Sequence, residues 1–180
     1  KVAGHGLAFS GFAQDLWSEH LLDVEDASAY IASFKANCDF AADLGIKGIR
    51  VDTVQPPTLH RTIDHGTLLK RLVRAWDTCI RYAADKGLYV CWEFEPGFAF
   101  NKPSDIQRVL DALPHPNFGV LYDTCHGQMV AVVGARQEGE KETLPGGQLE
   151  LIRRISGRIN HVHLIDSDNS CHKDAHGNDE

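Results

Sequence analysis

Short apolar segments alternate with longer amphipathic segments along most of this chain, and this alternation constrains the fold more than any other feature. The short segments have the length of strands, and the longer ones repeat their apolar residues at helical spacing. Strand–helix–strand units with short turns predict parallel strands joined by right-handed crossovers. The expected strands are Lys1–Gly4, Ile46–Thr53, Leu88–Phe94, Phe118–Asp123 and Ile159–Ile165.

Helical periodicity fills the segments between these strands. The expected helices are Ser28–Leu44, Thr67–Lys86, a helix that opens at Ser104, a short one over Gln128–Ala135, and Leu149–Ile155. Gly45 and Gly87 are placed to end the first two helices. Ser104, followed three residues later by Gln107, predicts an N-cap with a capping box. The Gly- and Glu-rich stretch Gln137–Gly147 predicts a solvated loop.

The strands divide their side chains between an apolar face and a polar face. In the second strand, Ile49 and Val51 share one face, whereas Arg50 and Asp52 share the other. The matching faces of the later strands carry Cys91, Glu93 and Glu95, then Leu121 and Asp123, then His161 and His163. A doubly wound sheet buries both faces in apolar contacts, whereas a barrel can keep polar groups at its C-terminal rim. We therefore expect an α/β protein with a (β/α)₈ barrel fold, as one domain over residues 1–180.

The overall composition excludes several classes of protein. The net charge of −7 argues against a nucleic-acid partner, because an acidic surface repels phosphate backbones. No apolar run approaches the roughly 20 residues that span a bilayer, and no N-terminal signal is visible, so we expect no membrane partner. The five cysteines are dispersed and odd in number, which indicates reduced thiols in a cytoplasmic protein.

Three ionisable residues, Glu93, Asp123 and His163, lie near the C-terminal ends of three different expected strands. In a barrel these ends meet at one mouth, and carboxylate oxygens with an imidazole suit Mn²⁺, Mg²⁺, Co²⁺ or Zn²⁺. Each residue also has a structural alternative. Glu93 could pair with Arg50, Asp123 could cap the following turn, and His163 could be a core histidine. His126, just beyond a strand end, could bind substrate or lie in an exposed loop.

The order of these motifs resembles the xylose-isomerase-like barrels, the superfamily of sugar isomerases and epimerases, from about Leu44 onward. The matching segments are a strand ending in Glu93, the motif Asp123-Thr-Cys-His126, and the motif His161-Val-His163. The resemblance implies that Glu93, Asp123 and His163 bind the metal and that Glu93 is also one catalytic base. Glu95 is the alternative ligand, although the distance from Gly87 favours Glu93.

The resemblance also implies a substrate site and an incomplete barrel. His126 matches a substrate-binding histidine, Asp166 would orient the third ligand or contact substrate, and Glu95 would contact hydroxyls. The family's fourth ligand is a glutamate on the last strand, and the sequence reaches Glu180 without one. We therefore expect about five strands, with the N-terminal strand and the last two strands missing, and a C-terminal loop over Ser167–Glu180.

The expected activity is divalent-metal-dependent isomerisation or epimerisation of a ketose or related polyol, by proton transfer next to a polarised carbonyl. The loop His5–Asp26, with Phe9, Phe12 and Trp17, would act as an apolar lid or simply pack on the core. The partner would be a small sugar or polyol, and a homo-oligomer stays open.

Four alternatives stay open from the sequence. A dehydratase of the inosose type would use the same metal and base, and an apurinic-endonuclease-like hydrolase would need more histidines and a basic groove. The fragment itself could be inactive, because it lacks the fourth ligand. Arg50 and Asp52 would form a pair inside the barrel or contact substrate.

Overall fold

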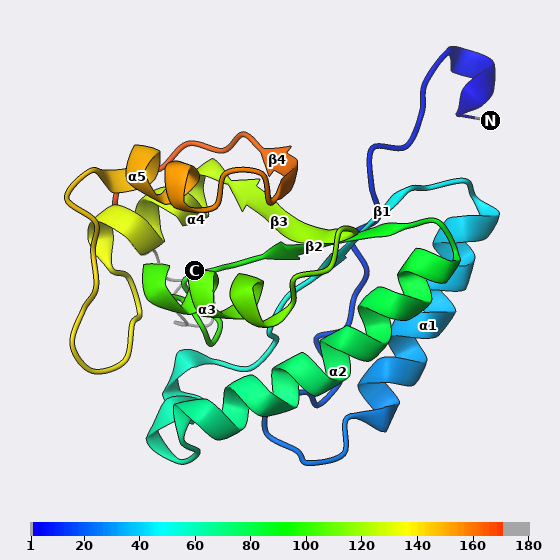
Figure 1. Ribbon diagram of the computed structural model, residues 1–180. Helices are drawn as coiled ribbons and strands as arrows, with labels where there is room; N and C mark the ends of the chain where they lie inside the picture. The colour runs from blue at the N-terminus through cyan, green and yellow to red at the C-terminus, as the bar shows by residue number, and fades with distance from the viewer. Residues whose placement is uncertain (1, 171–180) are drawn as a thin grey trace.

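The computed structural model describes residues 2–170, which form a parallel sheet in the strand order β1-β2-β3-β4 with helices on its outer side (Figure 1). The strands are β1 (Gly48–Val51), β2 (Tyr89–Glu93), β3 (Phe118–Asp123) and β4 (Ile159–His163). The α-helices are α1 (Ser28–Asp43), α2 (His65–Asp85), α3 (Pro103–Ala112), α4 (Thr124–Gln128) and α5 (Gly147–Arg154). Short 3₁₀-helices cover Ala3–His5 and Pro57–Arg61, and a π-helix covers Met129–Val133. This is part of a (β/α)₈ barrel, as the sequence predicts.

Helices α1 and α2 lie side by side against the sheet, and their apolar faces form much of the core (Figure 1). Tyr30 of α1 and Trp76 of α2 are both buried, and the Trp76 indole nitrogen donates to the Tyr30 hydroxyl at 3.1 Å. The ring of Trp76 also meets Trp92 of β2 and Phe118 of β3 edge-on. Buried aromatic residues therefore join both helices to the two central strands.

The ends of the first two long helices lie close to where the sequence places them. Gly45 and Gly87 follow α1 and α2 with φ of 72° each, a left-handed conformation that favours glycine. Asp64 caps α2, because its carboxylate accepts from the Thr67 amide. The expected cap at Ser104 is wrong: α3 begins one residue earlier, at Pro103. Ser104 instead bonds to the Glu142 carboxylate through both its amide and its hydroxyl.

The expected first strand, Lys1–Gly4, is also wrong within the described residues. A 3₁₀-helix covers Ala3–His5, and the chain from residue 4 to residue 10 is exposed, so this short apolar run has no sheet to pair with. Phe12 takes that role instead, as a single parallel bridge to Ile49. Its amide donates to the Gly48 carbonyl at 2.8 Å, and its carbonyl accepts from the Arg50 amide at 2.9 Å.

The expected loop Gln137–Gly147 is a loop up to Gly146, since α5 begins at Gly147, but it is more ordered than a purely solvated one. Gln137 is buried, and its side-chain amide donates to the carbonyls of Asn101, Val130 and Glu142. Its side-chain oxygen accepts from the Glu142 amide at 2.7 Å. One buried amide side chain therefore ties this loop to the body of the protein.

The two faces of the strands differ as predicted. Ile49, Val90, Trp92, Val120 and Tyr122 point into the core under the helices. Asp52, Glu93 and Asp123 follow the opposite face to the C-terminal ends of the strands. On the edge strand β4, Val162 remains 55% exposed within the described residues.

Most of the expected C-terminal loop, Ser167–Glu180, lies outside the described residues. None of the described helices is long and apolar enough to cross a membrane.

Candidate metal centre and adjoining cleft

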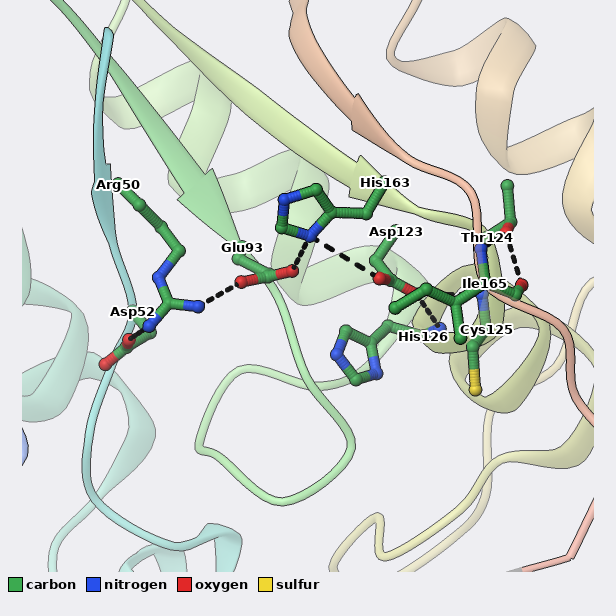
Figure 2. Close-up of polar contacts among 9 residues, drawn as sticks. All are labelled: Arg50, Asp52, Glu93, Asp123, Thr124, Cys125, His126, His163 and Ile165. Carbon is green, nitrogen blue, oxygen red and sulfur yellow. Dashed lines mark hydrogen bonds and ion pairs between the residues drawn. The ribbon is translucent and has the colours of Figure 1, made fainter. Parts of the chain in front are cut away.

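Three side chains from the ends of three neighbouring strands meet at one point of the sheet (Figure 2). Glu93 ends β2, Asp123 ends β3 and His163 ends β4. The parallel register places Asp123 directly beside His163, and Glu93 beside Leu121 one strand away. The convergence follows from the fold, because the carboxyl ends of parallel strands lie along one edge.

The atoms that could bind a cation are close together. Glu93 Oε1 lies 2.9 Å from His163 Nδ1, and Asp123 Oδ2 lies 3.7 Å from the same nitrogen. One such atom from each residue lies within 4.8 Å of the other two. Both carboxylates are buried, whereas the imidazole is 37% exposed, so the cluster opens to solvent on the side of β4.

The two oxygens of Asp123 have different environments. Oδ1 accepts from the amides of Cys125 and His126 at 2.8 and 3.1 Å, and so caps α4. Oδ2 is buried with no hydrogen-bond partner among the described residues. A buried carboxylate oxygen without a partner is unfavourable unless a cation or proton compensates it. The capping role expected as an alternative is therefore present, and it leaves the second oxygen free for a ligand.

Glu93 likewise combines its structural alternative, the pair with Arg50, with a second oxygen directed toward the cluster. Oε2 accepts from Arg50 Nη1 at 2.7 Å, while Oε1 faces His163. Arg50 Nη2 lies 3.6 Å from Asp52 Oδ2, so one guanidinium lies between two buried carboxylates (Figure 2). Arg50 and Asp52 thus pair inside the barrel, which is one of the two roles the sequence left open for them. The donor set of two carboxylates and one imidazole fits Mg²⁺, Mn²⁺, Co²⁺ or Zn²⁺.

A second group overlaps the first. Asp123, Cys125 and His126 also offer ligand atoms within 4.8 Å of one another. Cys125 lies within the motif Asp123-Thr-Cys-His126, but no ligand role is predicted for it from the sequence. Its position two residues after a strand-ending aspartate is the signal that places it here. Because the group shares Asp123 with the first, both belong to the same region of the protein.

A cleft of about 850 Å³ lies next to these residues. Its lining includes all three residues expected to contact substrate, namely Glu95, His126 and Asp166, together with Trp17, Phe98, Met129 and Arg136. Phe98, Met129 and Arg136 belong to no motif, so a role in the cleft wall is not predicted for them from the sequence. Such wall residues become visible only when the loops after β2 and β3 are placed in space.

The loop His5–Asp26, expected as a lid or as packing on the core, contributes only one of its three large aromatic side chains to the lining of this cleft. Trp17 lines the cleft, where it is 59% exposed and meets Phe98 edge-on at 6.2 Å between ring centroids. Phe12 instead packs against Phe40 on α1, and Phe9 is exposed away from the cleft lining. The loop therefore both packs on the core and supplies one aromatic side chain to the rim.

Burial and neighbouring negative charge change the titration of the cleft residues. Burial, together with the negative charges of Glu93 and Asp52, raises the pKa of Glu95 to about 7. Burial lowers the pKa of His126, against the opposing effect of Asp123. The cleft therefore favours an uncharged imidazole beside a carboxyl group that holds its proton more strongly than usual.

The arrangement of a parallel strand–helix repeat with an acid–acid–imidazole cluster at the strand ends is that of an α/β barrel protein with a candidate metal site. The chain matches the family model described as "Xylose isomerase-like TIM barrel" over residues 1–180. It therefore belongs to the xylose isomerase-like TIM barrel family, as the motifs predict. No curated protein matches the chain.

Solved structures share this fold at low sequence identity. A 3-keto-D-glucoside 4-epimerase from E. coli matches with a TM-score of 0.71 and 15% identity, over 98% of this chain and 65% of that one. A xylose isomerase-like TIM barrel protein from Mycobacterium smegmatis in complex with magnesium matches with a TM-score of 0.66 and 17% identity, over 90% and 52%. A probable 3-DHS dehydratase from Bacillus anthracis matches with a TM-score of 0.66 and 15% identity, over 89% and 52%.

These matches, all below 25% identity, show the fold that this chain shares with the family. Its members include sugar epimerases and dehydratases. The chain spans between about half and two thirds of the length of the structures that it matches. The substrate and reaction of the whole protein therefore have to be argued from the site.

Proposed function

We propose that this chain carries the cation site and part of the substrate site of a metal-dependent sugar isomerase or epimerase. The observation that carries the proposal is the buried, unpartnered Asp123 Oδ2 beside Glu93 Oε1 and His163 Nδ1. The structure from Mycobacterium smegmatis, a protein of the same family, is a complex with magnesium. Glu93, Asp123 and His163 would hold the cation in this chain.

The cation would supply Lewis acidity at a substrate carbonyl, which makes a neighbouring C–H easier to deprotonate. Glu93, whose second oxygen accepts from Arg50 in this structure, would act as one base for that proton. Glu95, His126 and Asp166 would bind hydroxyl groups, since all three line the same cleft. Trp17 and Phe98 would exclude water from one wall.

The neighbours favour a sugar or polyol as substrate. The match from E. coli is named for a keto-glucoside, which is a sugar derivative that contains a carbonyl group. Carboxylates and a neutral imidazole in a cleft suit hydroxyl groups as hydrogen-bond partners. We therefore propose a ketose or a cyclic polyol ketone as the class of substrate.

A dehydratase is the second candidate, because one of the matching structures is described as a dehydratase. Loss of water after proton removal needs the same base and the same cation. Mass analysis of the product separates the two activities: an epimer keeps the substrate mass, whereas elimination lowers it by one water. The nuclease alternative is disfavoured by the net charge of −7 and by the single imidazole of the first cluster.

Two measurements test the proposal. Calorimetric titration with Mg²⁺ and Mn²⁺ should show binding to the protein and a loss of affinity in Glu93→Ala. Equal affinity in the two proteins would remove the proposed centre. Incubation with a panel of ketoses in D₂O should then show deuterium at the carbon next to the carbonyl, and Glu93→Gln should abolish it.

A further inference from the structure

A chain of four side chains joins the rim of the cleft to the candidate metal centre. The Trp17 indole Nε1 donates to Asp52 Oδ2 at 3.2 Å. Arg50 Nη2 lies 3.6 Å from that same oxygen, and Arg50 Nη1 donates to Glu93 Oε2 at 2.7 Å. Figure 2 shows Arg50 between the two carboxylates. A residue of the first loop is thus connected to a proposed ligand through a buried carboxylate and a partly buried guanidinium.

The guanidinium is shared unequally between its two partners. It lies close to Glu93 and loosely beside Asp52, although both carboxylates are buried. Two polar atoms of this group, Arg50 Nε and Asp52 Oδ1, are buried without a hydrogen-bond partner. Unpaired buried atoms are unfavourable, and a guanidinium commonly pairs with a carboxylate through two parallel bonds. A shift of Arg50 toward Asp52 would therefore give partners to atoms that now have none.

We propose that Arg50 is a positioning residue that couples cation binding at Glu93 to release of Trp17 from Asp52. This inference rests on the proposed function, because it requires a cation at Glu93. A cation there competes with Arg50 for the negative charge of Glu93 and drives the guanidinium onto Asp52. Arg50 and the Trp17 indole then compete for the same carboxylate, and the indole bond weakens.

Linkage gives the coupling a second, testable consequence. If the cation weakens the bond between Trp17 and Asp52, that bond must oppose cation binding by the same factor. Trp17 is 59% exposed, so its position depends largely on this bond and on its contact with Phe98. The rim of the cleft therefore loosens when the centre is filled, which is when a substrate has to enter.

The test is calorimetric titration of Mg²⁺ into the wild-type protein, Asp52→Asn and Trp17→Phe. Asp52→Asn leaves Arg50 paired with Glu93, so the Mg²⁺ dissociation constant should rise by about three- to tenfold. Trp17→Phe keeps an aromatic ring against Phe98 and frees Asp52 for Arg50, so that constant should fall by about two- to fivefold. A merely structural role would weaken binding in both variants.

A spectroscopic measurement follows the indole directly. Trp76 and Trp92 are buried, so acrylamide quenching of fluorescence reports mainly on Trp17. Quenching should increase when Mg²⁺ binds the wild-type protein and should stay unchanged in Trp17→Phe. Asp77→Asn serves as the control for charge removal, because Asp77 is an exposed acid on α2 that pairs with Arg81. Its Mg²⁺ affinity should equal that of the wild type.

The outcomes separate this inference from the proposed function. Failure of the wild-type protein to bind Mg²⁺ overturns both. Wild-type binding with opposite shifts in the two variants and a Trp17-dependent increase in quenching supports the coupling. Wild-type binding with any other pattern overturns the coupling and leaves the proposed centre in place. Circular dichroism of each variant checks that it is folded.

Discussion

Asp123 caps a helix with one oxygen and leaves the other buried without a partner. Similar division occurs at Glu93, where one oxygen pairs with Arg50 and the other faces His163. At both residues, the structural role and the proposed ligand role concern different atoms of one carboxylate. The sequence predicts these roles only as alternatives, because it does not distinguish the two oxygens of a carboxylate.

Replacement of Asp123 by Asn tests the cost of that unpartnered oxygen. The amide oxygen can still accept from the Cys125 and His126 amides, but the buried negative charge is gone. We expect a higher unfolding temperature than wild type in EDTA, by a free-energy gain of about 1 kcal/mol, and Mg²⁺ affinity at least about tenfold lower. Thermal unfolding and calorimetry measure the two effects. A variant that is less stable in EDTA and binds Mg²⁺ normally would contradict the argument.

At the scale of elements, the ends of helices and the loops between them depend on single side chains. Asp64 caps α2, in agreement with the general preference for aspartate at helix N-caps. Ser104 does not cap α3 and instead bonds to Glu142. Gln137 ties the loop 137–147 through four hydrogen bonds to backbone groups. These contacts join segments that are distant in the sequence.

The cap at Asp64 predicts a pH-dependent effect. Hydrogen bonds from Thr67 lower the pKa of Asp64 below its ordinary value of 3.8. A lowered pKa means that the carboxylate contributes stability above pH 3.8, and that this contribution is lost as the pH falls through the lower value. Asp64→Ala should therefore unfold at a lower temperature than wild type at pH 7, with the difference shrinking toward pH 2. An equal difference at every pH would speak against a charged cap.

The hydrogen bonds of the Gln137 side chain should contribute measurably to stability. In Gln137→Leu the Glu142 amide and three carbonyls lose a buried partner, so the free energy of unfolding should fall by about 2–3 kcal/mol. Urea denaturation measures the loss, and limited proteolysis should cut the loop 137–147 faster. Gln107→Ala is the matched control, because Gln107 bonds only locally to Asp111 on an exposed helix face. A loss of stability in Gln107→Ala as large as that in Gln137→Leu would indicate that Gln107 forms the expected capping box, against the structure.

The whole molecule is an α/β sheet that its relatives extend, since the chain spans about half to two thirds of their length. The two outer edges of the sheet show this incompleteness in different ways. On one side, Phe12 makes only a single bridge to β1. On the other, Val162 of β4 and Leu164 just after it are exposed at 55% and 88%. Exposed apolar side chains on an edge strand favour association with another strand.

This edge predicts how the chain behaves in solution. We expect concentration-dependent association, measured by size-exclusion chromatography with light scattering. Val162→Lys should reduce it, because a charge on an edge strand opposes pairing. Ala112→Lys adds the same charge at an exposed position at the end of α3 and should leave association unchanged. A monodisperse wild-type monomer at high concentration would contradict the expectation.

Much of the fold follows from local pattern. Three local signals were enough for most elements: the two-residue period of the strands, the helical spacing of apolar residues, and the glycines after α1 and α2. Each of them depends only on neighbours along the chain. The alternation of strands and helices that they define predicts the parallel sheet. The pattern failed at Lys1–Gly4, where an apolar run has no partner strand, and at Ser104, whose partner lies 38 residues away. Local preference decides a cap or a strand only when no distant group competes.

For the candidate site, strand period in the sequence is enough to predict which ionisable residues end which strands, and hence that Glu93, Asp123 and His163 converge. The folded structure was needed to show that Asp123 Oδ2 is left without a hydrogen-bond partner and that Glu93 is divided between Arg50 and His163. The structure was also needed to show that Trp17 bonds to Asp52, and that Phe98 and Arg136 lie in the cleft wall. The reason is physical: strand period fixes the direction of a side chain, whereas hydrogen-bond partners depend on loops that meet only after folding.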